Sequence, residues 1–466
     1  MPQIKIVTEV AGRICAVVAS AGGSIGSGDD VVLVEAMKME IPVPSPAAGK
    51  VVSILVSVDD VVAEGQTIAL LETESNWGGF FMTRHINAVA AIVLAGTTIS
   101  PVLAQEVKLP TSMAFTAYDT GTSGFNIAVG VGKMMKDKYG SDVRVLPAGN
   151  DVARLAPLRT NRAVLAWMGT GSYFAQEGVF EFGVKEWGPQ ALQMTLSTVD
   201  CNGLSVGVAK DSGVKEWKDF RGKRLGFVVG SPALNQNALA IIAYAGLTQK
   251  DVKIVEFASY GAMWKGVINN DADGAFGSTV TGPAKELESS PRGIVWPELP
   301  AGDKAAWDRV KKVGAFFNPH DVTCGAAIES SKPLKLATYP YPIATAYATQ
   351  PVDQIYGLTK AMIVNYDMYK DAAPGSSGLD VKKQTKQWVI PYHPGAVKAL
   401  KEAGQWTDAD EKYNNDLIKR QGVLADAWKA YNTASAPGEP AAFLSGWMAA
   451  RKAALAKANM PNGFED

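Results

Sequence analysis

Lys38 stands between two methionines in the segment Glu35-Ala-Met-Lys-Met-Glu40, and its ε-amine is the most distinctive reactive group in the chain. A lysine amine is a nucleophile only after it loses its proton, and its ordinary pKa is about 10.4. A lysine held out from a rigid scaffold suits covalent attachment of an acyl group. The alternative is an ordinary surface lysine in a β-turn.

A second set of polar residues lies in four short, glycine-containing loops at residues 119–124, 169–172, 230–235 and 277–282. Three of these loops open predicted helices, whose free N–H groups and dipole favour a carboxylate or phosphate. The alternative is that their Ser, Thr and Asn side chains only cap helices. The candidate ligand-binding residues are Tyr118, Thr120, Gly121, Thr122, Ser123, Asn126, Arg154, Thr170, Gly171, Ser172, Ser231, Asn235, Ser278 and Thr279.

Arg154 is the candidate clamp for an acidic ligand, since a guanidinium grips a carboxylate with two parallel hydrogen bonds. It lies one turn into the helix that follows Gly149-Asn150. We expect the neighbouring Arg159 and Arg162 to be solvated. Tyr260 and Trp264 are expected to wall the pocket with Tyr118 or to pack in the core.

The sequence on the two sides of Lys38 is an internal repeat. Ala11-Gly-Arg-Ile14 matches Ala48-Gly-Lys-Val51, 37 positions later, and the match extends over residues 11–35 and 48–72. Both copies are rich in Val and Ile, have Gly or Asp turns and lack a helical period. The repeat predicts a small all-β barrel or sandwich with pseudo-twofold symmetry and Lys38 between its halves.

This motif and repeat resemble the biotin carboxyl carrier domain, whose biotinylated lysine lies in an Ala-Met-Lys-Met motif at a hairpin tip. The resemblance implies a carrier domain over residues 1–75, with biotin bound covalently to Lys38 between Met37 and Met39. It also implies biotin ligase and a biotin-dependent carboxylase as partners. One departure is Asp59, which stands where that family usually has glycine.

Strand-like and helix-like segments alternate after residue 105, which predicts parallel sheets in two α/β lobes. From Val352 onward the chain is mainly helical. We expect the first lobe at residues 105–202 and the second at 203–322, with 323–466 returning to the first lobe and ending in helices. The pattern therefore predicts a two-lobed α/β architecture with ligands beyond the carboxyl ends of the strands. It resembles periplasmic binding proteins, and this resemblance implies a type II-like fold of that class.

Several segments resemble the TAXI class of solute receptors, which serve TRAP transporters. They are Thr116–Asn126, Gln176–Phe180, Trp217–Arg224, Ser231–Asn235, Tyr260–Gly266 and Asp273–Ser278. The resemblance implies an extracytoplasmic receptor that closes two lobes over an organic-acid-like ligand and delivers it to TRAP permease membrane subunits. The chain lacks the Gly/Tyr-rich first loop of many members, so ligand identity does not carry over.

Residues 82–104 have the pattern of a secretory signal peptide, although about 80 residues precede them. A short basic region at 82–85 is followed by an apolar run at 88–96, and cleavage after Ala104 would leave Gln105 first. We therefore expect 76–104 to be a linker plus an internal signal peptide or anchor. The carrier domain is then cytoplasmic, and the chain from Gln105 is periplasmic.

Residues 74–81 at the junction have two interpretations. Gly78-Gly79 can be encoded by GGAGG plus one base, at ribosome-binding-site spacing before the Met82 codon. On this hypothesis residues 74–81 are translated leader sequence. The alternative is a true fusion with an inert linker.

The composition restricts the remaining possibilities. A net charge of −1 disfavours nucleic-acid partners, and three histidines with three cysteines make a metal centre improbable. No Ser-His-Asp set, P-loop or Gly-x-Gly-x-x-Gly turn supports catalysis. Cys201 and Cys324 are expected near the lobe crossings, where they either pair or remain separate thiols.

The sequence thus favours a TRAP-type receptor for a small carboxylate, preceded by a biotinyl domain. One alternative is a biotin carboxyl carrier subunit of a carboxylase or decarboxylase. Another is an enzyme of the related thiamine-precursor type.

Overall fold

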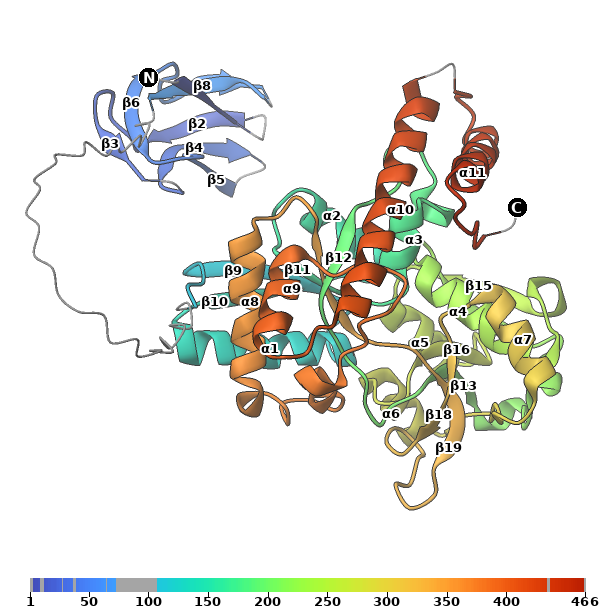
Figure 1. Cartoon of the computed structure of the whole chain (residues 1–466). Coiled ribbons are helices and arrows are strands. Elements are labelled where there is room, and N and C mark those ends of the chain that lie inside the picture. Colours follow the sequence, from blue (N-terminus) through green and yellow to red (C-terminus); the bar gives the residue numbers. More distant parts are fainter. Residues whose placement is uncertain are drawn as a thin grey trace, which may run out of the picture. The chain divides into compact units, whose positions relative to one another are not determined.

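The computed structural model describes residues 3–8, 12–26, 28–36, 39–63, 65–72, 107–433 and 436–464. The predicted signal peptide, its cleavage site and the junction at 74–81 lie outside these residues. Two compact units divide the chain between Pro101 and Val102. Figure 1 labels elements of both units.

The first unit consists of two four-stranded antiparallel sheets. Their strand orders are β1-β8-β6-β3 and β5-β4-β2-β7. The strands are β1 (Gln3–Val7), β2 (Gly12–Val17), β3 (Ser24–Ile25), β4 (Asp30–Ala36), β5 (Met39–Pro44), β6 (Gly49–Ile54), β7 (Val61–Val62) and β8 (Thr67–Glu72). The alternating Val, Ile and Leu side chains of the strands form a separate apolar core, as the period-2 pattern predicts.

The repeat in the sequence is a repeat in the structure. A Cβ on Gly12 would approach the Glu35 carbonyl oxygen to 2.5 Å, and one on Gly49 would approach that of Glu72 to 2.4 Å. Both glycines therefore permit the same close contact between strands, in positions 37 residues apart.

The second unit begins with a lobe built on a five-stranded sheet of order β10-β9-β11-β20-β12. Its elements are β9 (Ser112–Ala117), α1 (Ser123–Tyr139), β10 (Asp142–Pro147), α2 (Asp151–Arg159), β11 (Leu165–Met168), α3 (Gly171–Glu177), β12 (Leu192–Ser197) and β20 (Ile343–Tyr347). β9, β10 and β11 are parallel, whereas β20 runs antiparallel to both of its neighbours.

The second lobe has a sheet of order β15-β14-β16-β13-β19-β18, with β17 paired to β13. Its elements are β13 (Leu204–Ala209), β14 (Arg224–Val228), α4 (Pro232–Ile242), β15 (Lys253–Phe257), α5 (Tyr260–Ile268), β16 (Gly274–Ser278), α6 (Gly282–Ser289), β17 (Ile294–Val295), α7 (Lys304–Val313), β18 (Asn318–Val322) and β19 (Leu334–Thr338).

The end of this lobe corrects the boundary expected at residue 322. β19 pairs along its length with β18 and also bridges β13, so residues 334–338 belong to the second sheet. The chain returns to the first lobe only after Thr338. The low apolar content of 323–333 conceals this last strand from the sequence pattern.

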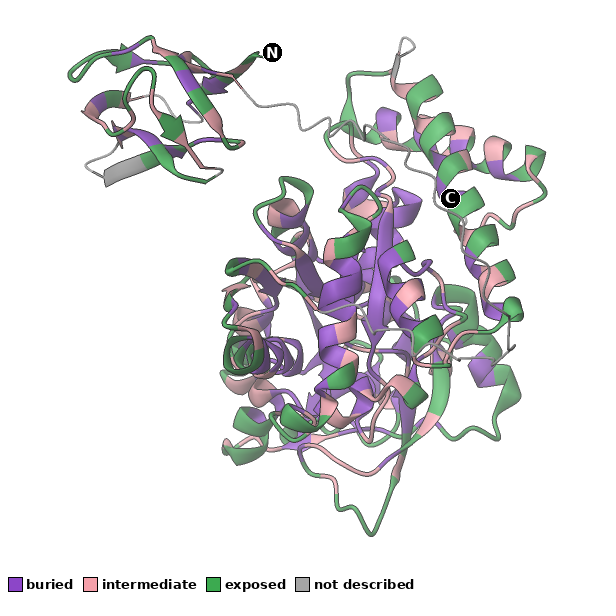
Figure 2. Ribbon diagram, turned by 60° about the vertical axis from the view of Figure 1, so that its left-hand side comes forward, coloured by how far each residue is buried: buried purple, intermediate pink, exposed green. Residues whose placement is uncertain are grey.

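The C-terminal part is helical, as predicted. It comprises α8 (Val352–Val364), α9 (Pro394–Glu402), α10 (Asp408–Thr433) and α11 (Pro440–Lys457). Short 3-10 helices are η1 (Phe180–Phe182), η2 (Lys210–Ser212), η3 (Trp217–Phe220), η4 (Ala243–Ala245), η5 (Gln249–Asp251), η6 (Tyr366–Met368), η7 (Ser376–Leu379) and η8 (Val381–Lys383). Buried residues concentrate in the strands and the helix faces against them (Figure 2).

Candidate functional site

A narrow cavity lies between the two lobes of the second unit. Its volume is about 20 Å³, which is room for about one water molecule. The lining residues are Tyr118, Arg154, Gly169, Leu204, Ala233, Leu234, Asn237, Tyr260, Phe276, Gly277, Ser278, Tyr339 and Tyr341. The two lobes are therefore closed on one another.

The cavity lies at the carboxyl ends of the central strands, the position predicted for a ligand site. Tyr118 follows β9, Gly169 follows β11, and Ser278 ends β16. Ala233 is in the first turn of α4, which follows β14. Three of the four predicted loops thus contribute residues that line the cavity. The fourth loop, 119–124, begins immediately after the lining residue Tyr118.

Arg154 is fully buried and lines the cavity, as the clamp hypothesis requires. Its Nη1 donates to the Trp167 carbonyl oxygen at 2.8 Å, and its guanidinium carbon lies 3.4 Å from the centroid of the Tyr118 ring. Its Nε has no hydrogen-bond partner in the described structure. Burial lowers the pKa of Arg154, but Tyr118 and Asp151 outweigh burial and raise it, so the group is cationic.

Asp151 is the partner of Arg154 and was not predicted as a site residue. Its carboxylate is fully buried, and Oδ1 accepts from both Arg154 Nη2 and the Tyr118 hydroxyl, the latter at 2.7 Å. Oδ2 accepts from the Ala233 backbone N–H at 2.8 Å. A Cβ on Gly171 would lie 2.8 Å from the Asp151 Cγ, so glycine is needed there. The helix N-terminus of α4 therefore holds a carboxylate of this same chain.

A second aspartate makes an equivalent contact. Asp119 Oδ2 accepts from the Gly261 backbone N–H at 2.9 Å, in the first turn of α5. Asp119 and Asp151 belong to the first lobe, and α4 and α5 belong to the second. Each carboxylate thus satisfies a free helix N–H across the cleft and holds the lobes together.

Most of the predicted hydroxyl and amide residues have structural partners. Thr122 caps α1, because its Oγ1 accepts from the Phe125 N–H at 3.3 Å. Asn235 holds the Val228 backbone, and Ser172 donates to the Gly169 carbonyl oxygen at 2.6 Å.

The other predicted polar residues divide into inter-lobe contacts and surface positions. The Ser231 and Tyr118 hydroxyls are 3.1 Å apart, and Thr170 accepts from Asn237 at 3.0 Å. Gly121 accepts from the Gly282 N–H at 3.1 Å. Ser123 is buried, whereas Thr120 and Asn126 are exposed, and none of the three lines the cavity.

Tyr339 and Tyr341 are site residues that the sequence analysis missed. Both lie where the chain returns to the first lobe, and both line the cavity with Tyr118 and Tyr260. The Tyr118 and Tyr260 rings stack with centroids 5.5 Å apart. Burial raises the pKa of all four phenols, so their hydroxyls are neutral. The only available signal was the local run Tyr-Pro-Tyr-Pro, which has no helical or strand period.

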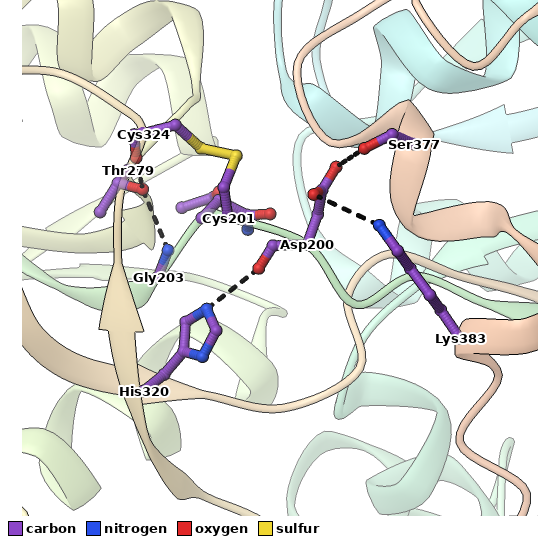
Figure 3. The surroundings of a disulfide bond; sticks show 10 residues. Asp200, Cys201, Gly203, Thr279, His320, Cys324, Ser377 and Lys383 are labelled. Atoms are coloured by element: carbon purple, nitrogen blue, oxygen red, sulfur yellow. Dashed lines mark hydrogen bonds and ion pairs between the residues drawn. A yellow bond between two sulfur atoms is a disulfide. The ribbon is translucent and has the colours of Figure 1, made fainter. Parts of the chain in front are cut away.

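Cys201 and Cys324 form a disulfide beside the lobe crossing (Figure 3). The Thr279 hydroxyl donates to the Cys324 carbonyl oxygen at 2.9 Å. The same hydroxyl oxygen of Thr279 accepts from the Gly203 N–H at 3.1 Å. Thr279 directly follows Ser278 of the cavity wall. The disulfide therefore supports the loop that carries the lining residue Ser278. Thr279, a predicted ligand-binding residue, contacts the disulfide segment and does not line the cavity.

Asp200 connects the same crossing to both lobes (Figure 3). Its carbonyl oxygen lies 3.0 Å from Nε2 of His320 on β18 of the second lobe. Its carboxylate accepts from the Ser377 hydroxyl and lies 4.0 Å from Lys383 Nζ, both of the first lobe. Asp200 therefore fixes the crossing segment to both lobes.

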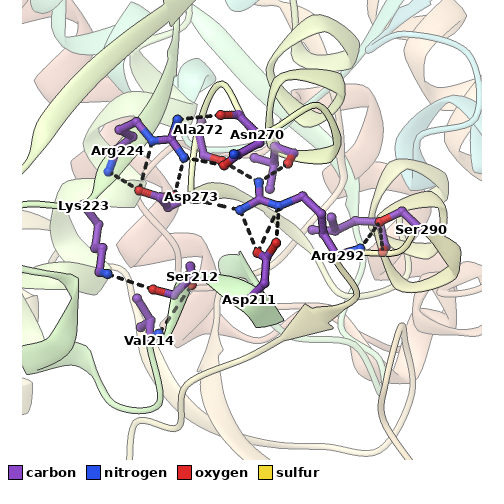
Figure 4. A network of polar contacts seen from close by, with 12 residues as sticks. Asp211, Ser212, Val214, Lys223, Arg224, Asn270, Ala272, Asp273, Ser290 and Arg292 are labelled. Atoms are coloured by element: carbon purple, nitrogen blue, oxygen red, sulfur yellow. Dashed lines mark hydrogen bonds and ion pairs between the residues drawn. The ribbon is translucent and has the colours of Figure 1, made fainter.

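A further polar network lies at the amino ends of β14 and β16, away from the cavity (Figure 4). Arg224 Nη2 pairs with Asp273 Oδ1 at 2.7 Å, and Arg292 Nη2 pairs with Asp211 Oδ1 at 2.7 Å. Burial raises the pKa of Asp273, but hydrogen bonds and charge from Arg224 lower it further, to below its ordinary value. This network joins elements of the second lobe and is structural.

In the first unit, β4 ends at Ala36 and β5 begins at Met39, with these two residues paired. Lys38 and Met37 lie between them, outside the described residues, and the Met39 side chain is likewise not described. The turn at Asp59 forms with φ of 77°, and Gly22, its counterpart in the first repeat, has φ of 80°.

The described residues contain no group of His, Cys, Asp and Glu arranged to hold a metal ion. Within the same parts of the chain, none of the helices combines the length and apolar character needed to cross a membrane.

Two family models match the chain. A model described as the NMT1-like family matches residues 115–404, and a model described as biotin-requiring enzyme matches residues 1–71. The Biotinylated protein TB7.3 homolog of Mycobacterium leprae is 48% identical over 63 residues, which are 14% of this chain and 89% of that protein. The first unit is therefore a biotin-attachment domain, homologous to biotinylated proteins.

The same unit is similar to small parts of larger proteins. The alpha subunit of mitochondrial methylcrotonoyl-CoA carboxylase from Dictyostelium discoideum is 35% identical over 67 residues, 14% of this chain and 10% of that protein. The urea amidolyase of Lachancea kluyveri is 37% identical over 67 residues, and the chain spans only 4% of it.

Solved structures similar to the second unit are solute-binding proteins. The alkanesulfonate-binding protein SsuA from Xanthomonas axonopodis pv. citri, bound to MOPS, is 16% identical; the match covers 69% of this chain and 93% of that one, with a TM-score of 0.36. An ancestral arginine-binding protein is 13% identical; the match covers 57% and 97% respectively, with a TM-score of 0.35. The second unit itself consists of two α/β lobes.

Proposed function

The chain belongs to the NMT1-like family, and from this premise we propose that residues 105–466 are the extracytoplasmic receptor of a TRAP-type secondary transporter. The ligand is a small organic acid or amino acid. The observation that carries the proposal is the buried Arg154. This residue lines a narrow inter-lobe cavity, and its Nε has no hydrogen-bond partner in the described structure.

The ligand class follows from hydrogen-bond chemistry. A buried donor without a partner costs free energy, and a charge-assisted bond to a carboxylate removes that cost. The rest of the guanidinium is held by Trp167 and Asp151, so its orientation is fixed before the ligand arrives. Closure of the lobes then encloses the ligand.

The compartment is supported by two features. The Cys201–Cys324 disulfide suits an oxidising environment outside the cytosol. The signal-like segment at 82–104 directs everything after it through export. The six segments between Thr116 and Ser278 that resemble TAXI receptors support delivery to a TRAP permease.

The test is a thermal-shift screen of the full chain against organic acids, amino acids, sugars and cations. A ligand at a hundredfold excess over its dissociation constant stabilises the folded state by about 2.7 kcal/mol. At least one carboxylate is expected to raise the melting temperature clearly. Shifts from sugars or cations alone would contradict the ligand class.

A second function belongs to the first unit. Its homology to biotinylated proteins supports a carrier role, with Lys38 bearing biotin for a biotin-dependent carboxylase that acts in trans. Because biotin ligase and its ATP are cytosolic, this unit works in the cytoplasm.

The carrier role is tested by co-expression with biotin ligase and a streptavidin blot, comparing wild type with Lys38→Arg. The variant is expected to lose the signal completely, and an undiminished signal would refute the site. N-terminal sequencing of the periplasmic protein shows whether the two units remain one polypeptide; Gln105 is the expected first residue.

A further inference from the structure

We propose that the ligand is a small zwitterion, with its carboxylate on Arg154 and its cationic group among the tyrosine rings, and that Asp151 determines this requirement. The inference rests on the receptor function proposed above and narrows its ligand class. It starts from the charge balance around the cavity.

The cavity wall carries no net charge. Arg154 is the one ionised side chain among the described lining residues. Its positive charge is already matched by Asp151, which is fully buried and hydrogen-bonded to it. The four lining tyrosines are neutral, because burial raises their pKa.

A ligand of net charge therefore meets no compensating charge in this cavity. A monocarboxylate would bring one uncompensated negative charge into a buried space, and a dicarboxylate would bring two. Burial of an unbalanced charge costs more than burial of two opposite charges held close together, because the pair offsets part of its own desolvation. A zwitterion supplies the carboxylate for Arg154 without changing the net charge inside the cavity.

The positions that would receive a second carboxylate are filled by the chain itself. The N–H of Ala233 at the start of α4 donates to Asp151 at 2.8 Å. The N–H of Gly261 at the start of α5 donates to Asp119 at 2.9 Å. The N-termini of α4 and α5 are thus occupied by first-lobe aspartates, which leaves neither of these two for a second carboxylate.

The rest of the wall suits a cation. Five aromatic rings line the cavity, and a ring face attracts an ammonium group through its quadrupole. The Tyr118 ring already has the Arg154 guanidinium 3.4 Å from its centroid, so cation–π contact occurs in this wall. The other rings belong to Tyr260, Phe276, Tyr339 and Tyr341.

The test uses matched ligand pairs that differ only in the cationic group, measured by isothermal titration on the full chain. The pairs are glycine betaine with 3,3-dimethylbutanoate, valine with 3-methylbutanoate, and glycine with acetate. In at least one pair the zwitterion is expected to bind tenfold or more tightly than its anionic partner. Equal or reversed affinities, or no binding by any zwitterion, would overturn the inference.

Asp151→Asn provides the second arm, because it keeps the shape of the side chain and removes its charge. It leaves Arg154 unbalanced, so the affinity ratio of zwitterion to anion is expected to fall by tenfold or more. Asp119→Asn is the matched control: it removes a carboxylate from the same lobe interface that does not contact Arg154. Its ratio is expected to remain within twofold of wild type. Equal changes in both variants would show that Asp151 acts only in closure.

The two proposals fail differently. If anionic carboxylates bind as well as zwitterions and Arg154 variants abolish binding, the receptor function stands and the zwitterion requirement is wrong. If neither zwitterions nor anionic carboxylates bind, the proposed receptor function itself is wrong.

Discussion

At the scale of single residues, the ion pair of Arg154 and Asp151 serves the fold and the site together. Both side chains are fully buried, and each is held by further hydrogen bonds. Loss of either partner would leave a buried charge alone, which destabilises a protein by about 3–5 kcal/mol. Substitutions that keep the charge are therefore more informative than alanine.

Arg154→Lys is expected to weaken carboxylate binding at least tenfold, about 1.4 kcal/mol, while preserving the charge beside Asp151. A lysine has no Nε donor and no planar fork. The measurement is isothermal titration with the carboxylate found by thermal shift. Arg159→Lys is the control, because Arg159 is exposed with its guanidinium 4.6 Å from the Trp187 ring. Equal, small effects of both variants would show that Arg154 does not hold the ligand.

His393 predicts a dependence of stability on pH. It is buried at the start of α9, where Nδ1 accepts from the Gly395 N–H at 3.1 Å, and burial lowers its pKa from 6.5 to about 4. Between these values the unfolded chain binds the proton more readily than the folded chain. This contribution to stability is therefore complete above pH 6.5 and is lost as the pH falls toward 4, by about 2 kcal/mol at pH 5.

Urea unfolding at pH 7.5 and pH 5.0 measures this contribution against His393→Asn, which keeps a capping side chain without the titration. The wild type should lose about 2 kcal/mol more than the variant between the two pH values. Identical losses would show that folding does not lower the pKa of His393.

At the scale of elements, one buried glutamate fastens the C-terminal helices. Glu177 at the end of α3 accepts from Arg420 of α10 with both contacts at 2.7 Å, and from Arg451 of α11. The adjacent Gly178 carbonyl oxygen accepts from Trp447 Nε1 at 2.6 Å. Both helices thus share one anchor on the first lobe, and α10 has further contacts through Tyr413, Asn414 and Gln421.

Glu177→Gln is expected to destabilise the protein by about 3–5 kcal/mol, since it leaves two buried guanidinium groups without an anion. Hydrogen exchange should show protection lost first in α11. Asp367→Asn is the control, because it removes an exposed ion pair with Lys370 and should change stability by less than about 1 kcal/mol. Unchanged exchange in α11 would mean that apolar packing alone holds it.

Elements and sites differed in how far the sequence could predict them. The paired turns at Gly22 and Asp59 follow from the repeat. Neighbouring residues determine local periodicity and turn type, so the sequence alone is enough to predict them. The cavity position and Arg154 follow from the order of strands and helices. Asp151, Tyr339 and Tyr341 could not be found in this way. Their roles depend on which residues meet across two lobes, as Asp151 meets Ala233 at a sequence separation of 82.

At the scale of the whole molecule, the disulfide closes a loop over a sequence separation of 123 residues that contains nearly the entire second lobe. Cross-linking restricts the unfolded chain, and a native disulfide typically contributes about 2–4 kcal/mol. The double variant Cys201→Ser/Cys324→Ser should lose that amount in urea unfolding. A reducing agent should lower the stability of the wild type to the level of the variant. An effect of the reducing agent on the variant itself would point to another cause.

The central claim is that a small carboxylate binds between the lobes on Arg154. The most direct measurement is a crystal structure of the full chain with the carboxylate that gives the largest thermal shift. The account predicts closed lobes and a carboxylate oxygen within about 2.7–3.2 Å of Arg154 Nε. A ligand bound elsewhere, such as the open groove between residues 108–110 and α8, with Arg154 Nε still unpartnered, would contradict it.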